Sequence, residues 1–318
     1  MQYELRYQVI EPKRNTYQNV IDRYGDQPAT RYQEATLDVE PRENFHYRPT
    51  WIAGRELYDP GYTALRLADP YAFADPRGFY YTPYVTSRAA LHDEFGKTLG
   101  YLEERELLAK LPQPWRALLG DVVIPLRHYE SGAQLVSVAG ARFAYGTSLE
   151  QCCTFAAFDR IGNAQMLSRV GIALGQGTGD ALTAAKRAWL DAAHLQPLRR
   201  LTEQIMVTGD WAEGLLAIDY LDSLLYPLVY SGLDERALLG GAGAYSLFAQ
   251  HLTRWFADQR KWLDALVTAW QDDPEHGPAN KDHLDRIAGT WKPRAEEAAI
   301  ALSAAIGERL ERLNGATA

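Results

Sequence analysis

Residues 245–270 constrain the fold most strongly, because they predict one long uninterrupted helix. Neither Gly nor Pro occurs in this stretch, so at ~1.5 Å per residue the helix would be about 39 Å long. Its large apolar side chains recur three, four or seven positions apart, at Phe248, Leu252, Trp255, Trp262, Leu266 and Trp270. This is the spacing of one broad buried face. A helix of this length needs long partners, so the sequence predicts a bundle.

The same periodicity predicts further helices, which end where Pro or Gly occurs. Their ranges are 85–111, 115–123, 126–138, 141–174, a helix ending near 195, 198–207, 211–230 with a kink at Pro227, and 294–313 after a break that includes Pro293. On the 141–174 helix, Phe155 and Phe158 are expected on the buried face. No long strand-like alternation is present. The expected fold class is all-α, with residues 77–318 as one helical domain.

Residues 1–76 differ from the rest of the chain. They contain seven prolines and many Tyr and Arg residues, with little helical periodicity. Each proline favours extended backbone before it, while the many aromatic side chains are unlike a disordered tail. We therefore expect an extended arm that lies on another surface, either of this chain or of a partner.

Composition excludes several classes of protein. A formal net charge of −8 argues against a nucleic-acid binder, which needs a basic face. No apolar run is long enough to span a membrane, and residues 1–9 lack the apolar core of a signal peptide. The two cysteines, Cys152 and Cys153, are adjacent and are expected to be reduced thiols. The expected location is the cytoplasm.

The sequence contains only weak motifs for a metal or catalytic site. A carboxylate and a His stand three residues apart in Glu43–His46, Asp191–His194 and Asp273–His276, but each match falls in a loop or at a helix end. Ordinary polar residues at the surface or at helix caps explain these three matches. His251 on the 245–270 helix is expected to be a hydrogen-bonded core residue. No self-sufficient active site is predicted.

Three segments resemble a known family: YELRYQVIEPKRNTYQNVIDRYGDQPATRYQEAT (3–36), ENFHYRPTW (43–51) and DPYAFADPRGFYYTPYVTSRAALH (69–92). They are similar to the β subunit of the hydroxylase component of bacterial multicomponent monooxygenases, and most similar to the phenol hydroxylases. The resemblance implies a ferritin-like (ribonucleotide-reductase-like) bundle within an α2β2γ2 hydroxylase. It also implies a di-iron centre in the partner α subunit and none in this chain, a γ subunit, and a regulatory protein and reductase that act on the complex.

The resemblance further implies vestigial positions where an iron-binding helix would carry Glu-x-x-His. Here the matching positions are Asp159 and Gly162 on one helix and Asp258 and Lys261 on the 245–270 helix. Gly has no ligand atom, and a Lys ammonium only donates hydrogen bonds. Two interpretations of Lys261 stay open: it neutralises a buried polar core beside Asp258, or the two form an ordinary surface ion pair.

The arm provides the expected subunit interface, because Tyr, Trp and Arg are enriched where proteins pack against partners. The candidate residues are Tyr7, Arg14, Tyr17, Tyr24, Arg31, Tyr32, Tyr47, Arg48 and Trp51. Some of them are expected to pack on this chain's own bundle instead.

The resulting hypothesis is a non-catalytic structural β subunit of a di-iron monooxygenase of the phenol or toluene type. The assembled enzyme would hydroxylate an arene with O2 and electrons from NADH. Two alternatives stay open: a self-sufficient ferritin-like oxidase, and a non-enzymatic helical scaffold.

Overall fold

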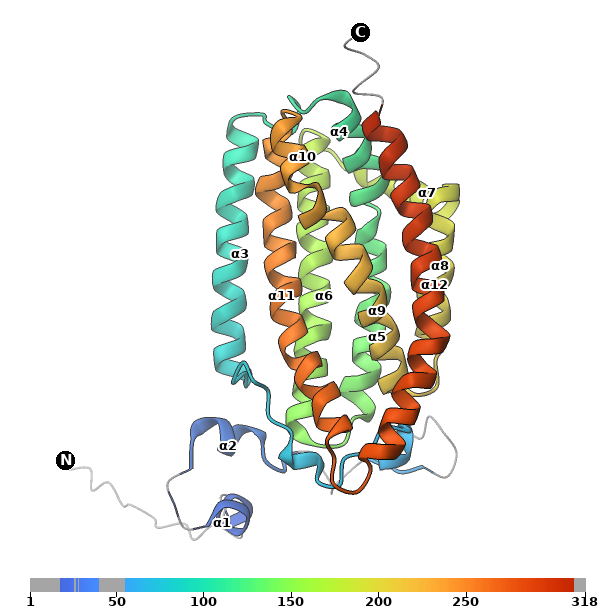
Figure 1. The fold of residues 1–318 in the computed structure, drawn as a ribbon. Helices are drawn as coiled ribbons and strands as arrows, with labels where there is room; N and C mark the ends of the chain where they lie inside the picture. The colour runs from blue at the N-terminus through green and yellow to red at the C-terminus, as the bar shows by residue number, and fades with distance from the viewer. Residues whose placement is uncertain (1–17, 26, 28, 40–54, 312–318) are drawn as a thin grey trace, which may run out of the picture.

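Six long helices run side by side along the length of the molecule (Figure 1). The computed structural model describes residues 18–25, 27, 29–39 and 55–311. The long helices are α3 (Tyr81–Glu104), α5 (Leu126–Phe143), α6 (Thr147–Leu174), α9 (Trp211–Val229), α11 (Gly243–Gln271) and α12 (Gly277–Glu311). The described residues include no β-strand, which confirms the all-α prediction.

Shorter helices close the ends and one side of the bundle. They are α1 (Gln18–Tyr24), α2 (Arg31–Thr36), α4 (Gln113–Leu118), α7 (Asp180–Asp191), α8 (Gln196–Met206) and α10 (Asp234–Leu239). Short 3-10 turns span Pro60–Tyr62, Pro70–Ala72, Ala193–Leu195 and Ser231–Leu233, and one π turn spans Leu119–Val123. Within the described ranges, no helix is long and apolar enough to cross a membrane.

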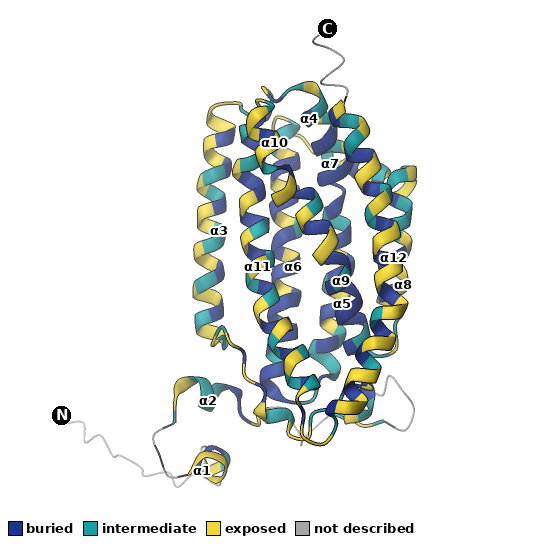
Figure 2. Cartoon of the chain, in the orientation of Figure 1, coloured by how far each residue is buried: buried dark blue, intermediate teal, exposed yellow. Residues whose placement is uncertain are grey.

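Helix α11 confirms the prediction for residues 245–270. It buries Trp255, Trp262 and Trp270 almost completely. Buried residues also cover much of α5, α6 and α9, as Figure 2 shows. Each large apolar side chain removed from water contributes about 1.5–3 kcal/mol, so the interior of these long helices supplies most of the driving force for the fold.

The predicted break before residue 294 is wrong, because α12 continues through Pro293. A proline inside a helix loses one backbone hydrogen bond and costs about 3 kcal/mol. Burial of Trp291, Ala295 and Ala298 on either side of Pro293 outweighs that cost. The indole of Trp291 also donates a 2.7 Å hydrogen bond to Glu213 on α9, which fixes this part of α12 against the bundle.

Two other predicted boundaries are corrected. Helix α3 ends at Glu104 rather than 111, and the left-handed backbone of Glu106 (φ 55°) prevents its continuation. The residues up to Phe143 complete α5 instead of starting the next helix. Gly146 makes the turn into α6 with φ 112°, where an added Cβ would lie 2.5 Å from the carbonyl oxygen of Pro70. Only glycine fits there without a shift.

The expectation that Phe158 is buried is also wrong. Phe155 is only 4% exposed, but Phe158 is 51% exposed and Ile161 on the same helix is 43% exposed. One face of α6 is therefore apolar yet left uncovered by the described residues. The periodicity shows that this face is apolar, but it cannot show whether the chain itself covers it.

Residues 63–70, which belong to the predicted arm, cross the end of this chain's own bundle (Figure 1). Their backbone N–H groups donate to side chains at helix ends. Ala64 donates to Asp210 at 2.7 Å, Arg66 to Asn280 at 2.9 Å and Ala68 to Asp273 at 2.7 Å. For this part of the arm, the surface it lies on is the chain's own.

Candidate functional site in the bundle core

A buried arginine joins α5, α6 and α9 in the middle of the bundle. Arg160 on α6 is only 2% exposed. Its Nη1 lies 3.1 Å from Glu130 Oε2 on α5 and 3.1 Å from Asp222 Oδ1 on α9, and its Nη2 forms a second bond with Asp222. One guanidinium thus bridges carboxylates from two other helices, each of them 1% exposed. We call these three residues the Arg160 cluster.

Neighbouring polar groups complete the hydrogen bonding of both carboxylates. Tyr129 donates to Asp222 Oδ1 at 2.6 Å, and Tyr226 donates to Glu130 Oε1 at 2.7 Å. Asn163, one turn after Arg160, donates to the Tyr226 hydroxyl at 3.1 Å. Buried charges are tolerated when they are paired and hydrogen-bonded in this way.

Helix α11 contributes an aromatic wall to the Arg160 cluster. The guanidinium carbon of Arg160 lies 4.7 Å from the ring centroid of Trp255, which is cation–π distance. Arg160 Nε has no hydrogen-bond acceptor among the described residues. The site therefore neutralises the charge of the guanidinium, but it does not provide an acceptor for each of its five N–H groups.

Burial and the opposite charges act against each other in the Arg160 cluster. Burial raises the pKa of Glu130 above its usual value, although Arg160 partly offsets this. Burial also opposes the charge of Arg160, yet Asp222 and Glu130 raise its pKa well above the ordinary range. Burial raises the pKa of Tyr129 and Tyr226 far enough that both stay neutral donors. The arginine is permanently charged.

These residues do not fit a di-iron centre. A ferritin-like di-iron site takes a Glu from each of two helices and a Glu-x-x-His pair from each of the other two. Here α5 and α9 supply the carboxylates Glu130 and Asp222, but α6 supplies Arg160 and Asn163. A cation with only donor atoms is hydrogen-bonded to both carboxylates, and it repels a metal ion from that place.

The predicted vestigial carboxylates Asp159 and Asp258 lie together, one helix face away from the Arg160 cluster. Both accept from Arg88 on α3: Asp159 from Nε and Nη2 at 2.8 Å, and Asp258 from Nη2 at 2.7 Å. The Tyr84 hydroxyl donates to Asp159 at 2.9 Å, and Arg77 approaches Asp258 at 3.6 Å. Burial opposes ionisation of Asp258, but Arg88 holds its pKa below the usual range.

The other two predicted positions, Gly162 and Lys261, have different surroundings. Gly162 faces His92 of α3, and an added Cβ would lie 2.9 Å from His92 Nε2. The side chain of Lys261 is 63% exposed, and it reaches Asp258 only at 3.4 Å. For Lys261 the surface ion-pair interpretation therefore holds, and the buried cations beside Asp258 are Arg88 and, at a longer distance, Arg77. That any of these positions is vestigial stays a prediction.

Sequence reasoning missed Arg160, Asn163, Glu130 and Asp222. On α6 the polar pair that points into the core, Arg160 and Asn163, begins one residue after the predicted pair. One residue turns a helix by about 100°. When a buried helix has polar residues on two faces, the sequence does not show which of those faces packs against the other helices.

Of the predicted interface residues, the structure describes three. Tyr24 is 40% exposed and Arg31 is also exposed. Tyr32 is half-buried against this chain, where its hydroxyl donates to Ser148 at 3.3 Å and accepts from the Asp75 N–H at 2.7 Å. Tyr7, Arg14, Tyr17, Tyr47, Arg48 and Trp51 lie outside the described residues.

The remaining motifs have structural partners. Cys152 and Cys153 are free and buried, and burial raises the pKa of both thiols. His251 is buried and lies 2.9 Å from the Thr98 hydroxyl, as expected for a core histidine. Asp273 accepts from the N–H groups of residues 275 and 276, which confirms capping. Glu43–His46 lies outside the described residues.

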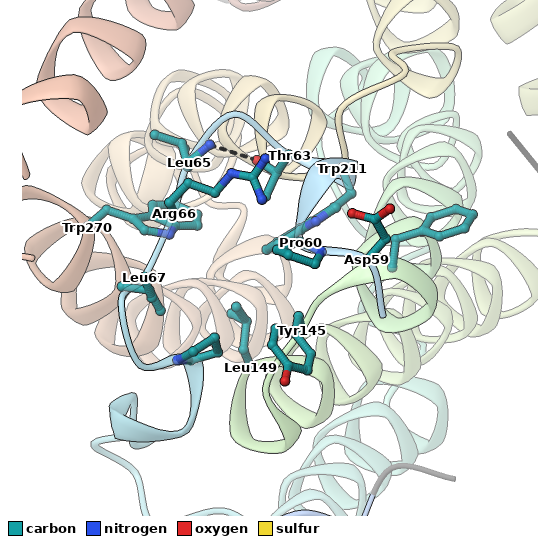
Figure 3. A pocket seen from close by; sticks show the side chains of 12 residues that line it. Asp59, Pro60, Thr63, Leu65, Arg66, Leu67, Tyr145, Leu149, Trp211 and Trp270 are labelled. Carbon is teal, nitrogen blue, oxygen red and sulfur yellow. Dashed lines mark hydrogen bonds between the residues drawn. The ribbon is translucent and has the colours of Figure 1, made fainter. Parts of the chain in front are cut away.

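A separate small pocket lies where residues 63–70 cross the bundle end. Figure 3 shows Leu65, Leu67, Trp211 and Trp270 around it, and its volume is about 30 Å³. By this measure one water needs about 10–15 Å³ and a cavity that binds benzene has about 150 Å³, so the pocket admits about two waters. It is too small for an aromatic substrate.

Similar proteins carry monooxygenase names. The chain is 38% identical over 304 residues to the oxygenase component DmpL of phenol 2-monooxygenase from Pseudomonas sp. (strain CF600), covering 95% of this chain and 91% of that protein. It is 36% identical to the oxygenase component MhpL of phenol 2-monooxygenase from Acinetobacter pittii (strain PHEA-2), covering 92% and 86%. A hydroxylase component small subunit of propane 2-monooxygenase from Mycolicibacterium smegmatis is 25% identical, covering 86% and 77%.

Solved structures agree with these sequence relatives. A chain of phenol hydroxylase from Pseudomonas sp. OX1 superposes with a TM-score of 0.85 at 35% identity, covering 98% of both chains. A chain of toluene 4-monooxygenase shares the fold with a TM-score of 0.71 at 19% identity, covering 76% of this chain and 80% of that one. The model of the methane/phenol/alkene hydroxylase family matches residues 49–274. By sequence and by its ferritin-like helical bundle, this chain belongs to the methane/phenol/alkene hydroxylase family and is a subunit of a hydroxylase complex of the phenol hydroxylase type.

Proposed function

We propose that this chain is the non-catalytic β subunit of a phenol hydroxylase-type complex. It supports a partner α subunit that holds the di-iron centre and hydroxylates an arene with O2 and electrons from NADH. The proposed assembly is a cytoplasmic α2β2γ2 hydroxylase, served by a regulatory protein and a reductase. The name of one relative supports the role, since the propane 2-monooxygenase protein is a small subunit of a hydroxylase component.

The observation that carries the proposal is the position of Arg160. Its guanidinium is hydrogen-bonded to Glu130 and Asp222 in the core between the long helices. A metal pair at this place would need those carboxylates, and Arg160 neutralises them instead. This arrangement supports the proposal that the oxygen chemistry takes place in a different chain of the complex.

Purification from the native cells tests this role. An affinity tag on this chain should recover a larger chain with two Glu-x-x-His motifs, a small third chain, and iron in proportion to the larger chain. The chain expressed by itself should bind no stoichiometric iron and should hydroxylate no phenol. If the isolated chain carries iron in a one-to-one or two-to-one ratio and has activity, it is a self-sufficient oxidase. If it is recovered without any iron-bearing partner, it is a scaffold.

A further inference from the structure

We propose that Arg160 is a built-in replacement for a metal ion, and that the Arg160 cluster becomes a divalent-metal site when that arginine is exchanged. The inference concerns this chain by itself and stands whether or not it assembles with a catalytic partner. Three helices, α5, α6 and α9, converge on one point. Glu130 and Asp222 both lie within hydrogen-bond distance of Arg160, so each carboxylate is directed at the same place from a different helix.

The second step concerns the spacing on α6. Arg160 and Asn163 stand three residues apart and both take part in the same hydrogen-bond network, Arg160 directly and Asn163 through the Tyr226 hydroxyl. Glu and His at this spacing are the pair that a metal-binding helix of such a bundle presents. Position 160 thus already faces both carboxylates, and position 163 lies one turn further along α6, linked to Glu130 by the Tyr226 hydroxyl.

The arginine does not satisfy the site completely. Its Nε has no acceptor among the described residues, although the atom is buried. The side of the guanidinium that faces α11 is covered by the Trp255 ring, not by a carboxylate. Arg160 thus supplies one positive charge and three bonds to acidic residues, which is the neutralising role of a cation in a site built from two carboxylates.

The test is Arg160→Glu combined with Asn163→His, probed with Co²⁺ added to the full-length chain. Zn²⁺ is bound by His nitrogen and carboxylate oxygen, and Co²⁺ stands near Zn²⁺ in the affinity order of the divalent metals. We expect visible Co²⁺ absorption bands and stoichiometric binding by titration, with Zn²⁺ as competitor. Adding Glu130→Gln should weaken Co²⁺ binding at least about tenfold, because one ligand is lost. The unaltered chain should bind no Co²⁺ at the core.

A matched control separates the cluster from the motif itself. Arg169→Glu with Ile172→His places the same pair on the exposed face of α6, where the structure offers no second carboxylate from α5 or α9. This control should bind Co²⁺ no better than the unaltered chain. Equal binding by the core variant and the control would overturn the proposal, as would Co²⁺ binding in the core of the unaltered chain.

The core variant gathers three carboxylates in the interior and could unfold without metal. Circular dichroism with and without Co²⁺ then decides: recovery of helicity on adding Co²⁺ supports the proposal, and no recovery overturns it.

A companion variant tests the charge argument directly. Arg160→Met should lower the melting temperature, and adding Glu130→Gln and Asp222→Asn should restore much of it because the core is then neutral. No restoration would show that Arg160 acts by shape and not by charge.

Discussion

Asp159 on α6 and Asp258 on α11 are held together by one guanidinium, that of Arg88 on α3, at 2.8 Å and 2.7 Å. This bridge and the Arg160 cluster lie on different faces of α6, since its adjacent residues Asp159 and Arg160 point about 100° apart and contact different partners. Helix α3 is thereby fastened to the bundle through charge as well as through the stacking of Tyr84 on Phe155.

Loss of this bridge should destabilise the chain. Arg88→Met leaves Asp159 buried without its cation, and breaking one partner of a buried pair costs about 3–5 kcal/mol. Because Asp258 is partly exposed, we expect the lower end, about 3 kcal/mol, from urea unfolding at pH 7. The matched control Lys261→Met removes an exposed cation beside the same Asp258 and should cost under about 0.5 kcal/mol. Equal costs for both variants would contradict the role of Arg88.

The Arg88 bridge also gives a pH dependence. The pKa of Asp258 is lowered in the folded chain, so its contribution to stability is present above its unfolded pKa of about 3.9 and is lost as pH falls through the lower folded value. The stability difference between the unaltered chain and Arg88→Met should therefore shrink as pH falls below about 4. A difference that stays constant down to pH 3 would show that packing of the arginine stem, and not its charge, is responsible.

Asp219 on α9 should behave in the opposite way. Burial raises its pKa to about 6, although Arg260 binds it, and its Oδ1 has no hydrogen-bond partner among the described residues. A raised carboxyl pKa means that the folded state binds the proton more tightly. The contribution of Asp219 to stability is therefore greatest below pH 4 and falls as pH rises through about 6, by at most about 3 kcal/mol.

Asp219→Asn should consequently raise the melting temperature at pH 8 and change it little at pH 4. Asp264→Asn is the control, because Asp264 contacts the same Arg260 from an exposed position. It should show no such pH dependence. Destabilisation by Asp219→Asn at pH 8 would mean that the bond with Arg260 outweighs the cost of burying Asp219.

Removal of a predicted vestigial carboxylate should leave the enzyme's metal unchanged. Asp258→Ala should not alter the iron content of the assembled complex, because Asp258 is occupied by a 2.7 Å hydrogen bond from Arg88. Helix α3 should become easier to detach, seen as faster hydrogen exchange in residues 81–104. Loss of about half of the iron would show that this chain holds part of the metal.

Deletion of residues 1–50 should weaken assembly while the bundle stays helical by circular dichroism. The long helices begin at residue 81 and pack mainly on one another, although the deleted part does contact α6 where Tyr32 donates to Ser148. Substituting only Tyr32 by Phe is a useful comparison, because it removes an internal contact with Ser148 without shortening the chain. Complete assembly after the deletion would show that the arm is not the interface.

The sequence by itself determined the fold class and helix α11. The apolar spacing of residues 245–270 predicts α11 closely, because helix formation depends on local periodicity and on the absence of Gly and Pro. A helix boundary is predicted at Pro293, but α12 continues through it, which shows the limit of local signals. Burial of Trp291 and Ala295 is a tertiary contribution, and it outweighs the local cost of the proline.

Only the tertiary structure decided which polar residues meet. Asp159 and Arg160 are neighbours in the sequence, both are buried, and nothing local distinguishes the face that meets α3 from the face that meets α5 and α9. Glu130 and Asp222 lie 30 and 62 residues away from Arg160, so no short motif connects them. Helix rotation within the bundle brings them together, and that rotation is set by the packing of all the long helices at once.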